Sequence, residues 1–484
     1  MTTQPPAATT PRRNLHALVK AYDVRGLVGE QLDEDVARAL GAAFAQEVLS
    51  DGAGDGVSRV VVGHDMRPSS PGLTAAFAEG VAGRGLDVVV AGLVSTDALY
   101  YASGALDAPG AMFTASHNPA AYNGIKLCRS GARPISQDTG LARIRDRAQA
   151  LLDGADDTAS GTPGTVTRQD VLAGYAAYLR GLVDLSGGRP LRVVVDAGNG
   201  MAGLTTPAVL GTAAGLPALP LDVVPLYFEL DGTFPNHEAN PLEPENLRDL
   251  QAAVVREGAD LGLAFDGDAD RCFVVDERGE PVSPSAVTAL VARREIAKER
   301  AAGREATVIH NLITSRAVPE AIAEAGGTAV RTRVGHSFIK AEMARVRAVF
   351  GGEHSAHYYF REFWFADTGM LAAMHVLAAL GEQDGPLSAL TAGEERYVAS
   401  GEVNSRVDDV VAATARVEAA YADRPDVEVD RLDGLTVSHP AAPMWWFNLR
   451  PSNTEPLLRL NAEAADAGTM SRLRDDVLAL VRAG

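Results

Sequence analysis

The chain has 484 residues, of which 46% are hydrophobic and 22% charged, and its formal net charge is −19. A chain of this length is too long for one compact core, so we expect several domains of an ordinary globular protein. The acidic balance argues against non-specific binding to nucleic acid, and no apolar run is long enough to suggest a membrane span. The two cysteines, Cys128 and Cys272, are too few for a disulfide framework and favour a reducing, cytoplasmic compartment.

The first 13 residues are rich in proline, threonine and alanine. They lack the apolar core of a secretory signal, so we interpret them as a disordered tail. After this tail we expect four domains, which cover residues 14–160, 161–280, 281–393 and 394–484. Residues 152–165 and 381–386 are rich in glycine and aspartate, which is typical of linkers.

One pattern occurs three times in the chain after this tail. Each copy begins with a short β-branched run, passes through a polar or glycine-containing turn into a helical stretch, and continues with a second and a third strand. The first strands of the three copies begin at Arg59, Arg192 and Thr307. Alternating strands and helices are typical of largely parallel sheets covered by helices. The sequence therefore predicts an α/β fold with three similar domains.

The third strand of each copy ends in a polar loop. These loops contain "TASHNP" from Thr114, "DGDADR" from Asp266 and "EHSAHYYF" from Glu353. Ligands bind outside the carboxyl ends of the strands in such sheets, so we expect the three loops to share one cleft. The competing interpretation is that α/β repeats resemble one another by composition alone. From about Arg396 the pattern changes, and a smaller α+β domain is expected.

The segment "FDGDADR" places Asp266, Asp268 and Asp270 at alternate positions. Three carboxylates this close repel one another unless a cation lies among them, and oxygen-only ligands suit Mg²⁺ or Ca²⁺. An EF-hand loop would have Glu277 at its twelfth position, but Arg271 replaces the glycine needed at the sixth, and the flanks are typical of strands. A solvated acidic turn is the remaining alternative, and the apolar strands on both sides argue against it.

Ser116 follows an apolar strand and precedes Lys126. It lacks the G-x-S-x-G setting of a hydrolase nucleophile, and by itself it would be interpreted, with Asn118, as a cap of the turn before Pro119. A phosphorylated serine beside a divalent cation would instead be a phosphoryl donor. Lys126 could then deprotonate the acceptor hydroxyl, provided that neighbouring cations lower its pKa.

Two further loops offer groups for a sugar and a phosphate. Glu353, Ser355 and His357 stand at alternate positions, so all three can point to one face of an extended segment. The segment "RPSNTEPLLR" places two arginines around hydroxyl and amide side chains, which suits a phosphate dianion. A Ser-Asn-Thr run alone is typical of a turn, so the prediction depends on the joint occurrence of the motifs.

The motifs "YDVRG", "TASHNP", "DGDADR", "GEHSAH" and "RPSNTEP" occur in the order and approximate spacing of the α-D-phosphohexomutase superfamily. The chain resembles this superfamily over nearly its whole length after the tail, and bacterial phosphomannomutases most, because of "GEHSAHYYF". The resemblance implies three similar α/β domains with mixed sheets and a smaller C-terminal α+β domain around a central cleft. It also implies an intramolecular phosphotransferase that interconverts hexose 1-phosphate and 6-phosphate through a phosphoserine and a bound hexose 1,6-bisphosphate.

The resemblance assigns a role to each motif. Ser116 would carry the phosphoryl group and, with Asp266, Asp268 and Asp270, would hold Mg²⁺. The groups around the transferred phosphoryl would be Lys126 as the preferred general base, His117 as its partner in proton transfer, Arg25 at the phosphoserine and Arg271 at the substrate.

The same resemblance assigns the substrate contacts. Glu353 and Ser355 would hold O3 and O4 of the sugar, and the loop of the last domain would bind the phosphate that is not transferred. The implied substrate-binding residues are His336, Lys340, Glu353, Ser355, Arg450, Ser452, Asn453, Thr454 and Arg459.

The preferred hexose is less well defined by the motifs. Ala269 replaces a glycine of many phosphomannomutases and is common in phosphoglucosamine mutases, whereas "TASHNP" and His354 are less usual there. No motif reads the configuration at C2, so we expect mannose and glucose phosphates both to react, with mannose preferred. Phosphoglucomutase and phosphoglucosamine mutase remain alternatives.

A non-catalytic sugar-phosphate-binding protein would be expected to lack Ser116, an aspartate or Lys126, all of which are present. A phosphatase would differ only in admitting water. The expected partners are hexose phosphates, with no nucleic acid and no membrane, and the expected state is a monomer or homodimer.

Overall fold

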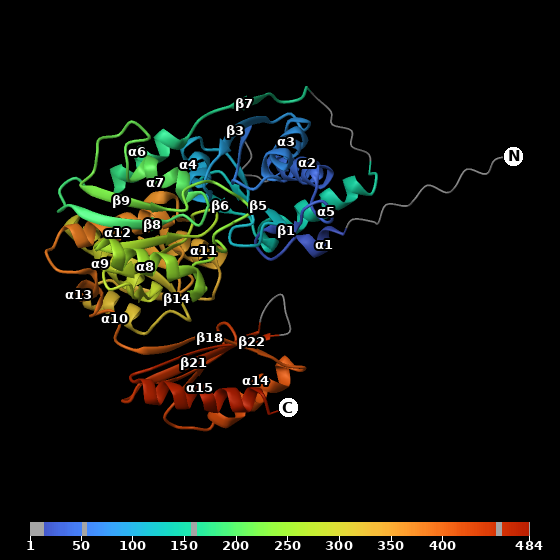
Figure 1. Ribbon diagram of the computed structural model, residues 1–484. Coiled ribbons are helices and arrows are strands. Elements are labelled where there is room, and N and C mark those ends of the chain that lie inside the picture. Colours follow the sequence, from blue (N-terminus) through green and yellow to red (C-terminus); the bar gives the residue numbers. More distant parts are fainter. Residues whose placement is uncertain (1–13, 51–55, 156–161, 452–456, 484) are drawn as a thin grey trace.

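The computed structural model describes residues 14–50, 56–155, 162–451 and 457–483. Three α/β domains form one body, and a fourth domain lies beside it (Figure 1). The predicted tail, residues 1–13, lies outside the described residues. No helix in the described part of the chain is long and apolar enough to cross a bilayer. Cys128 and Cys272 are both buried free thiols.

The three α/β domains repeat one topology, which confirms the predicted repeat. In each domain the first strand of the repeat, which is β2, β8 or β13, lies in parallel between the second and the third, and an antiparallel strand follows the third. The sheets are therefore mixed. Their strand orders are β1-β5-β4-β2-β3-β7 with β6 on β5, β12-β11-β10-β8-β9, and β14-β13-β15-β16-β17.

In the described part of the first domain, α-helices accompany a sheet of seven strands. Its strands are β1 (Val24–Leu27), β2 (Arg59–His64), β3 (Asp87–Leu93), β4 (Gly110–Phe113), β5 (Tyr122–Arg129), β6 (Arg133–Pro134) and β7 (Val166–Arg168). Its helices are α1 (Leu15–Leu18), α2 (Glu34–Ser50), α3 (Ser70–Ala82), α4 (Thr96–Ala105) and α5 (Leu141–Leu152). β7 follows the predicted linker at 152–165 and pairs with β3, so this part of the chain returns to the first sheet.

The second domain has the strands β8 (Leu191–Asp196), β9 (Leu221–Leu226), β10 (Leu261–Phe265), β11 (Cys272–Asp276) and β12 (Pro281–Val282). Its helices are α6 (Leu172–Leu182), α7 (Ala202–Val209) and α8 (Arg248–Glu257).

The third domain has the strands β13 (Thr307–Asn311), β14 (Thr328–Thr332), β15 (Phe350–Gly352), β16 (Tyr358–Phe360) and β17 (Ala366–Asp367). Its helices are α9 (Pro284–Ala301), α10 (Ala317–Glu324), α11 (His336–Val346), α12 (Gly369–Gly381) and α13 (Leu387–Thr391). The predicted linker at 381–386 is the turn between α12 and α13.

The fourth domain, as far as the structure describes it, is an antiparallel sheet of order β18-β22-β21-β20-β19 with the helices α14 and α15. Its elements are β18 (Val398–Arg406), α14 (Val410–Tyr421), β19 (Glu428–Asp430), β20 (Leu435–His439), β21 (Trp445–Pro451), β22 (Leu457–Ala464) and α15 (Ala467–Val481).

The β-branched runs form central strands because helices cover both faces of the sheets. In β2, Val60 and Val62 pack into the core with α2 and α3, whereas Val61 packs into the core on the opposite face. That second core continues without a break through Val194 of the second domain and Leu377 of the third. The fourth domain has a core of its own. The first three domains therefore form one packed body that can hold loops from different domains in register.

Candidate active site

The serine loop joins β4 to β5 and places Ser116 at the boundary between the first two domains. Ser116 has φ 49°, in the left-handed region that non-glycine residues adopt at a cost. Its backbone N–H donates to Thr114 Oγ1 (2.8 Å), and its hydroxyl donates to Asp266 Oδ2 (2.8 Å). The hydroxyl therefore touches the metal loop of the second domain, although 150 residues separate the two positions.

The metal loop, residues 266–271, is the hairpin between the antiparallel strands β10 and β11, so it is not an EF-hand. A Cβ at Gly267 would lie 2.5 Å from the carbonyl oxygen of Ser116, so only glycine allows the two loops to approach this closely. The carboxylates of Asp266, Asp268 and Asp270 are buried and offer oxygen atoms within 4.8 Å of one another.

The donor set of the metal loop fits a hard divalent cation. Asp268 Oδ1 and Asp270 Oδ1 are buried and have no hydrogen-bond partner among the described residues. Buried polar atoms without partners are uncommon, and carboxylate oxygens are the ligands that Mg²⁺ prefers. The residues present therefore suit Mg²⁺, which Asp266, Asp268 and Asp270 would hold together with Ser116.

The ammonium group of Lys126 balances part of the negative charge of the metal loop. Lys126 Nζ lies 2.7 Å from Asp268 Oδ2 and 2.5 Å from Asp270 Oδ2. Burial would lower the pKa of Lys126, but these two carboxylates outweigh it and raise the pKa well above its usual value. The condition for Lys126 to act as a base, a pKa lowered by neighbouring cations, is not met in this arrangement, because the charges nearest to its ammonium are negative.

Arg271 binds the first aspartate of the metal loop and a histidine of the serine loop. Its Nε donates to Asp266 Oδ2 (2.9 Å) and its Nη2 to His117 Nδ1 (2.6 Å). Burial, with Arg271 and Arg25, lowers the pKa of His117 to about 2. His117 is therefore neutral and accepts a hydrogen bond at Nδ1. Arg25 donates to the carbonyl oxygen of Thr114 (3.3 Å), two residues before Ser116.

The sugar loop, residues 353–357, brings the third domain to the same place. Arg271 and His357 form an antiparallel β-bridge, and His357 Nε2 lies 3.7 Å from Asp270 Oδ1. Loops of three domains thus meet, as expected from the position of each loop after a third strand. His357 was noted in the motif but given no role, although the structure places it against the metal loop.

The sugar loop is a turn and not an extended segment. The loop turns at Ala356, where φ is 64°, so it is not the extended segment that alternate spacing assumes. Ser355 Oγ lies 3.0 Å from His357 Nδ1. Glu353 is 2% exposed and accepts hydrogen bonds from Tyr359 Oη (2.5 Å) and Asn311 Nδ2 (3.0 Å). The inference of a shared face from strand spacing therefore does not apply to this loop, in which Ser355 pairs with His357 and Glu353 with Tyr359 and Asn311.

His336 and Lys340 lie on the first turns of α11, and both contact residues of the first domain. The ring of Tyr22 packs edge-on against His336 at 5.0 Å, and burial lowers the pKa of His336 to about 3. Lys340 is buried, with its Nζ 2.5 Å from Asp367 Oδ1 and 4.1 Å from the ring centroid of Tyr100. Asp367, which sequence reasoning missed, therefore fixes a predicted substrate-binding lysine.

Arg450 and Arg459 are cross-strand neighbours on β21 and β22. Both lie near Glu402, at 3.9 and 3.1 Å, and the Nε atom of each is buried with no hydrogen-bond partner in the described part of the chain. Arg450 also lies 3.7 Å from Asp433, which accepts a hydrogen bond from the backbone N–H of Val334, next to the segment with His336. The other predicted phosphate ligands, Ser452, Asn453 and Thr454, lie outside the described residues.

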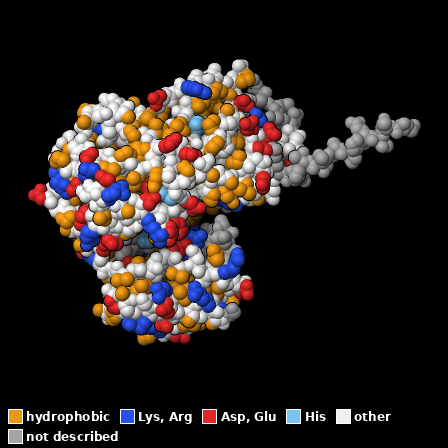
Figure 2. Space-filling view, viewed as in Figure 1, with side chains coloured by type: hydrophobic (Ala, Val, Ile, Leu, Met, Phe, Trp, Pro, Cys, Tyr) orange, Lys and Arg blue, Asp and Glu red, His pale blue; other side chains and the backbone are white. Residues whose placement is uncertain are grey.

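The surface is hollowed where the fourth domain meets the body, and side chains of both charges lie there (Figure 2). Two cavities, of about 460 and 380 Å³, lie between the third and fourth domains, and His354 of the sugar loop lines the smaller one. Arg450 and Arg459 therefore lie on a domain that is separated from the third domain by two cavities.

Thr96 at the start of α4 was also missed by sequence reasoning. Its Oγ1 donates to Asp268 Oδ2 (2.6 Å) and its N–H to the carbonyl oxygen of Asp268 (3.0 Å). Ser95 before it is a typical helix cap, a signal that predicts the start of a helix but not a contact with another domain.

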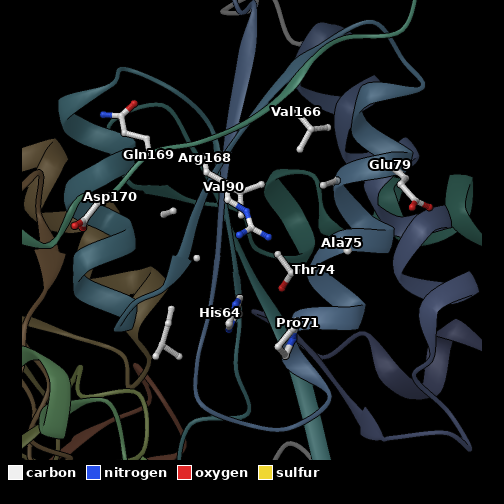
Figure 3. Close-up of a pocket in the computed structure, with 14 residues that line it drawn as sticks. His64, Pro71, Thr74, Ala75, Glu79, Val90, Val166, Arg168, Gln169 and Asp170 are labelled. Carbon is white, nitrogen blue, oxygen red and sulfur yellow. The ribbon is translucent and has the colours of Figure 1, made fainter.

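A further cavity of about 830 Å³ lies in the first domain, between α3 and the strands β3 and β7 (Figure 3). Thr74 and Ala75 of α3, Val90 of β3 and Arg168 of β7 line it, with His64 at one end. None of the predicted site residues lines this cavity, so it is separate from the meeting point of the three loops.

Comparison with known proteins identifies the class defined by this fold and site. Family models for phosphoglucomutase/phosphomannomutase match in order: α/β/α domains I, II and III over residues 16–153, 173–279 and 283–397, and the C-terminal domain over residues 402–480. The chain belongs to the phosphoglucomutase/phosphomannomutase family, and it is an enzyme of the intramolecular phosphotransferase class.

Individual relatives agree over nearly the full length. The chain is 42% identical to a protein of Xanthomonas campestris named phosphohexose mutases, covering 96% of this chain and 98% of that one. It is 38% identical to a phosphomannomutase of Escherichia coli K12, covering 92% and 94%. The crystal structure of a phosphoglucomutase/phosphomannomutase family protein from Burkholderia thailandensis matches with a TM-score of 0.84 at 33% identity, covering 97% and 98%.

Proposed function

We propose that this protein is a phosphomannomutase that interconverts mannose 1-phosphate and mannose 6-phosphate and also accepts glucose phosphates. Ser116 would carry the phosphoryl group, and a hexose 1,6-bisphosphate would be the intermediate and activator. The observation that carries this proposal is the contact between Ser116 Oγ and Asp266 Oδ2 (2.8 Å) at the point where loops of three domains meet.

The residues around Ser116 suit phosphoryl transfer to a sugar hydroxyl. Mg²⁺ bound to the three aspartates would supply positive charge where negative charge develops on the phosphoryl oxygens. Arg25 and Arg271 would add charge-assisted hydrogen bonds to the same oxygens. Lys126 can act as the base only in a state in which Asp268 and Asp270 no longer pair with its ammonium, because these ion pairs raise its pKa.

The groups proposed for the substrate lie on the third and fourth domains. Glu353 and Ser355 would hold O3 and O4 in either orientation of the bisphosphate, since these hydroxyls stay central when C1 and C6 exchange places. His336 and Lys340 would contact the ligand from α11. Arg450 and Arg459 would bind the other phosphate with Ser452, Asn453 and Thr454. None of these groups is expected to read the configuration at C2.

The preference for mannose rests on "GEHSAHYYF" and on relatives named phosphomannomutase at 38–39% identity. The relative named phosphohexose mutases supports a wider range of hexoses. One observation favours phosphoglucosamine mutase as a second candidate, namely Ala269 in place of glycine at φ 61°. Hexose phosphates are the proposed partners, and a monomeric or homodimeric state remains a prediction.

A side-by-side assay of mannose, glucose and glucosamine 1-phosphates, with glucose 1,6-bisphosphate as activator, tests the proposal. We expect kcat/KM to be highest for mannose 1-phosphate and about 10- to 100-fold lower for glucosamine 1-phosphate, because one or two mispaired hydrogen bonds cost about 1–3 kcal/mol. If glucosamine 1-phosphate is the best substrate, the assignment to phosphomannomutase is wrong.

A further inference from the structure

An arginine outside the predicted site binds the backbone of the serine loop. Arg67 follows β2 and is 1% exposed. Its Nη2 donates to the carbonyl oxygens of Ser116 (2.8 Å) and Asn118 (2.6 Å). Its Nη1 donates to those of Pro119 (2.9 Å) and Tyr122 (3.0 Å). One guanidinium thus binds four carbonyl groups of the loop that carries the proposed phosphoserine.

Arg67 is itself fixed from both sides. Its Nε donates to Asp65 Oδ2 (3.2 Å), and Asp65 Oδ1 accepts a hydrogen bond from the hydroxyl of Ser70 (2.6 Å). From the second domain, the ring of Phe234 lies 5.1 Å from Arg67 Cζ. A Cβ at Gly232 would lie 2.6 Å from Arg67 Cα, so this segment packs directly on the arginine. The side chain of Arg67 is therefore held in place from both sides and shielded from water.

All five N–H donors of the guanidinium are in use, one on Asp65 and four on the loop. Lysine has three donors on a point charge and cannot reproduce a planar fork. The loop needs such a constraint because Ser116 has φ 49°, a conformation that persists only where its surroundings impose it.

We propose that Arg67 is a positioning residue that holds Ser116 in register with the metal loop by binding the four carbonyl groups of the serine loop. Arg67 donates to the backbone of the loop, and its contribution to turnover would come through the placement of Ser116 Oγ. This inference rests on the proposed function of Ser116. It predicts a loss in the rate of phosphoryl transfer with little change in substrate affinity.

The test compares Arg67→Lys with Arg180→Lys in the full-length enzyme. Arg180 is a matched control, because its guanidinium also binds three backbone carbonyls, of Val209 (2.6 Å), Gly211 (2.5 Å) and Pro217 (2.5 Å), in a loop of the second domain away from the site. We expect Arg67→Lys to lower kcat about 100-fold or more, the effect of a misplacement of about 1 Å. KM should stay within about threefold, and Arg180→Lys should keep kcat within about twofold.

Two further measurements separate positioning from folding. The ³¹P resonance of protein phosphorylated with glucose 1,6-bisphosphate should be single and sharp in the parent and the Arg180→Lys enzyme, and shifted or broadened in Arg67→Lys. If Arg67→Lys does not fold, Asp65→Asn replaces it as the test. That variant removes the charge that anchors Arg67 but keeps an oxygen that can accept from Ser70 and from the backbone N–H of Arg67, so kcat should fall about 3- to 10-fold at unchanged KM.

Each outcome supports or overturns the inference. An unchanged kcat in the folded Arg67→Lys enzyme, or in Asp65→Asn where that variant is the test, overturns it. A rise in KM with kcat preserved, or equal losses in Arg67→Lys and Arg180→Lys, overturns it as well. If the parent enzyme takes up no phosphate on Ser116 yet turns over hexose phosphates, the proposed function has failed first, and the ³¹P measurement shows this independently of Arg67.

Discussion

The metal loop and the sugar loop occupy equivalent places in two copies of one repeat, but the carboxylates in them are in opposite states. Asp268 Oδ1 and Asp270 Oδ1 are buried without a hydrogen-bond partner among the described residues. Glu353 is equally buried, yet Tyr359 and Asn311 already donate to it. The metal loop therefore offers buried oxygens that lack a partner, whereas both carboxylate oxygens of Glu353 already accept hydrogen bonds from the protein.

This difference teaches that burial alone does not mark a binding group. An unpaired buried oxygen carries a desolvation cost that a ligand can relieve, whereas a paired one has no such cost to recover. Substitutions in the metal loop should accordingly have larger effects than those around Glu353.

The largest effect is expected at Ser116, whose hydroxyl donates to Asp266 of the metal loop. Ser116→Ala should lower turnover by more than about 1,000-fold, because the proposed carrier of the phosphoryl group is lost. Binding of a sugar phosphate, measured by calorimetry, should persist. Near-normal rates in the alanine variant would contradict the mechanism, and mass spectrometry of the parent should find phosphate on the peptide 112–126.

The next largest effect is expected when the metal or one of its aspartate ligands is removed. EDTA should silence the enzyme, and Mg²⁺ should restore it. Asp268→Asn should weaken Mg²⁺ binding at least about tenfold, because it removes one of three charged ligands. Asp276→Asn is the matched control, since Asp276 is buried at the end of β11 and binds Arg278 away from the site. Full activity after exhaustive dialysis against EDTA would remove the basis for the metal site.

A smaller effect is expected at the sugar loop. Glu353→Gln should raise KM about 10-fold, since it weakens a charge-assisted hydrogen bond to the substrate worth about 1–2 kcal/mol. Tyr359→Phe removes a donor that the sugar would replace, so KM should change less than about threefold. Equal losses in the two variants would show that Glu353 acts within the protein and does not contact the sugar.

The smallest effect is expected at Asp97, where the first domain contacts the domains that carry the metal loop and the sugar loop. Asp97 Oδ2 accepts hydrogen bonds from Tyr175 (2.6 Å) of the second domain and Thr368 (2.7 Å) of the third. Burial raises the pKa of Asp97 from 3.8 to about 6. The folded state therefore holds this proton more tightly than the unfolded state. The contribution of Asp97 to stability is fully present below about pH 4 and is lost as the pH rises through about 6.

Unfolding by urea at pH 5 and pH 8 measures this contribution. Relative to Asp97→Asn, the parent should lose about 1 kcal/mol of unfolding free energy between these two values. A difference that does not vary with pH would show that Asp97 is ionised in the folded state throughout. Activity at constant pH should differ little between the two proteins as long as both are folded.

The sequence predicted the elements of the site better than their contacts. The metal loop was predicted from three aspartates between apolar strands, and the structure brings their carboxylate oxygens within 4.8 Å of one another. The spacing of Glu353, Ser355 and His357 was interpreted with the period of an extended strand, but the segment turns at Ala356, so that period does not apply there. Thr96 and Asp367 carried no signal, because a single threonine or aspartate beside a helix start is typical of a cap.

The repeat of three α/β units and the order of the loops could be predicted from the residues alone. β-branched runs, turn residues and spaced carboxylates are local patterns, and local patterns specify strands, helices and the loops between them. Only the tertiary structure decided which loops touch. The contacts of Ser116 with Asp266, of Lys126 with Asp268, and of Arg67 with the serine loop span 49 to 150 residues. Such contacts depend on how one continuous core packs three domains together, and no periodicity in the chain records that packing.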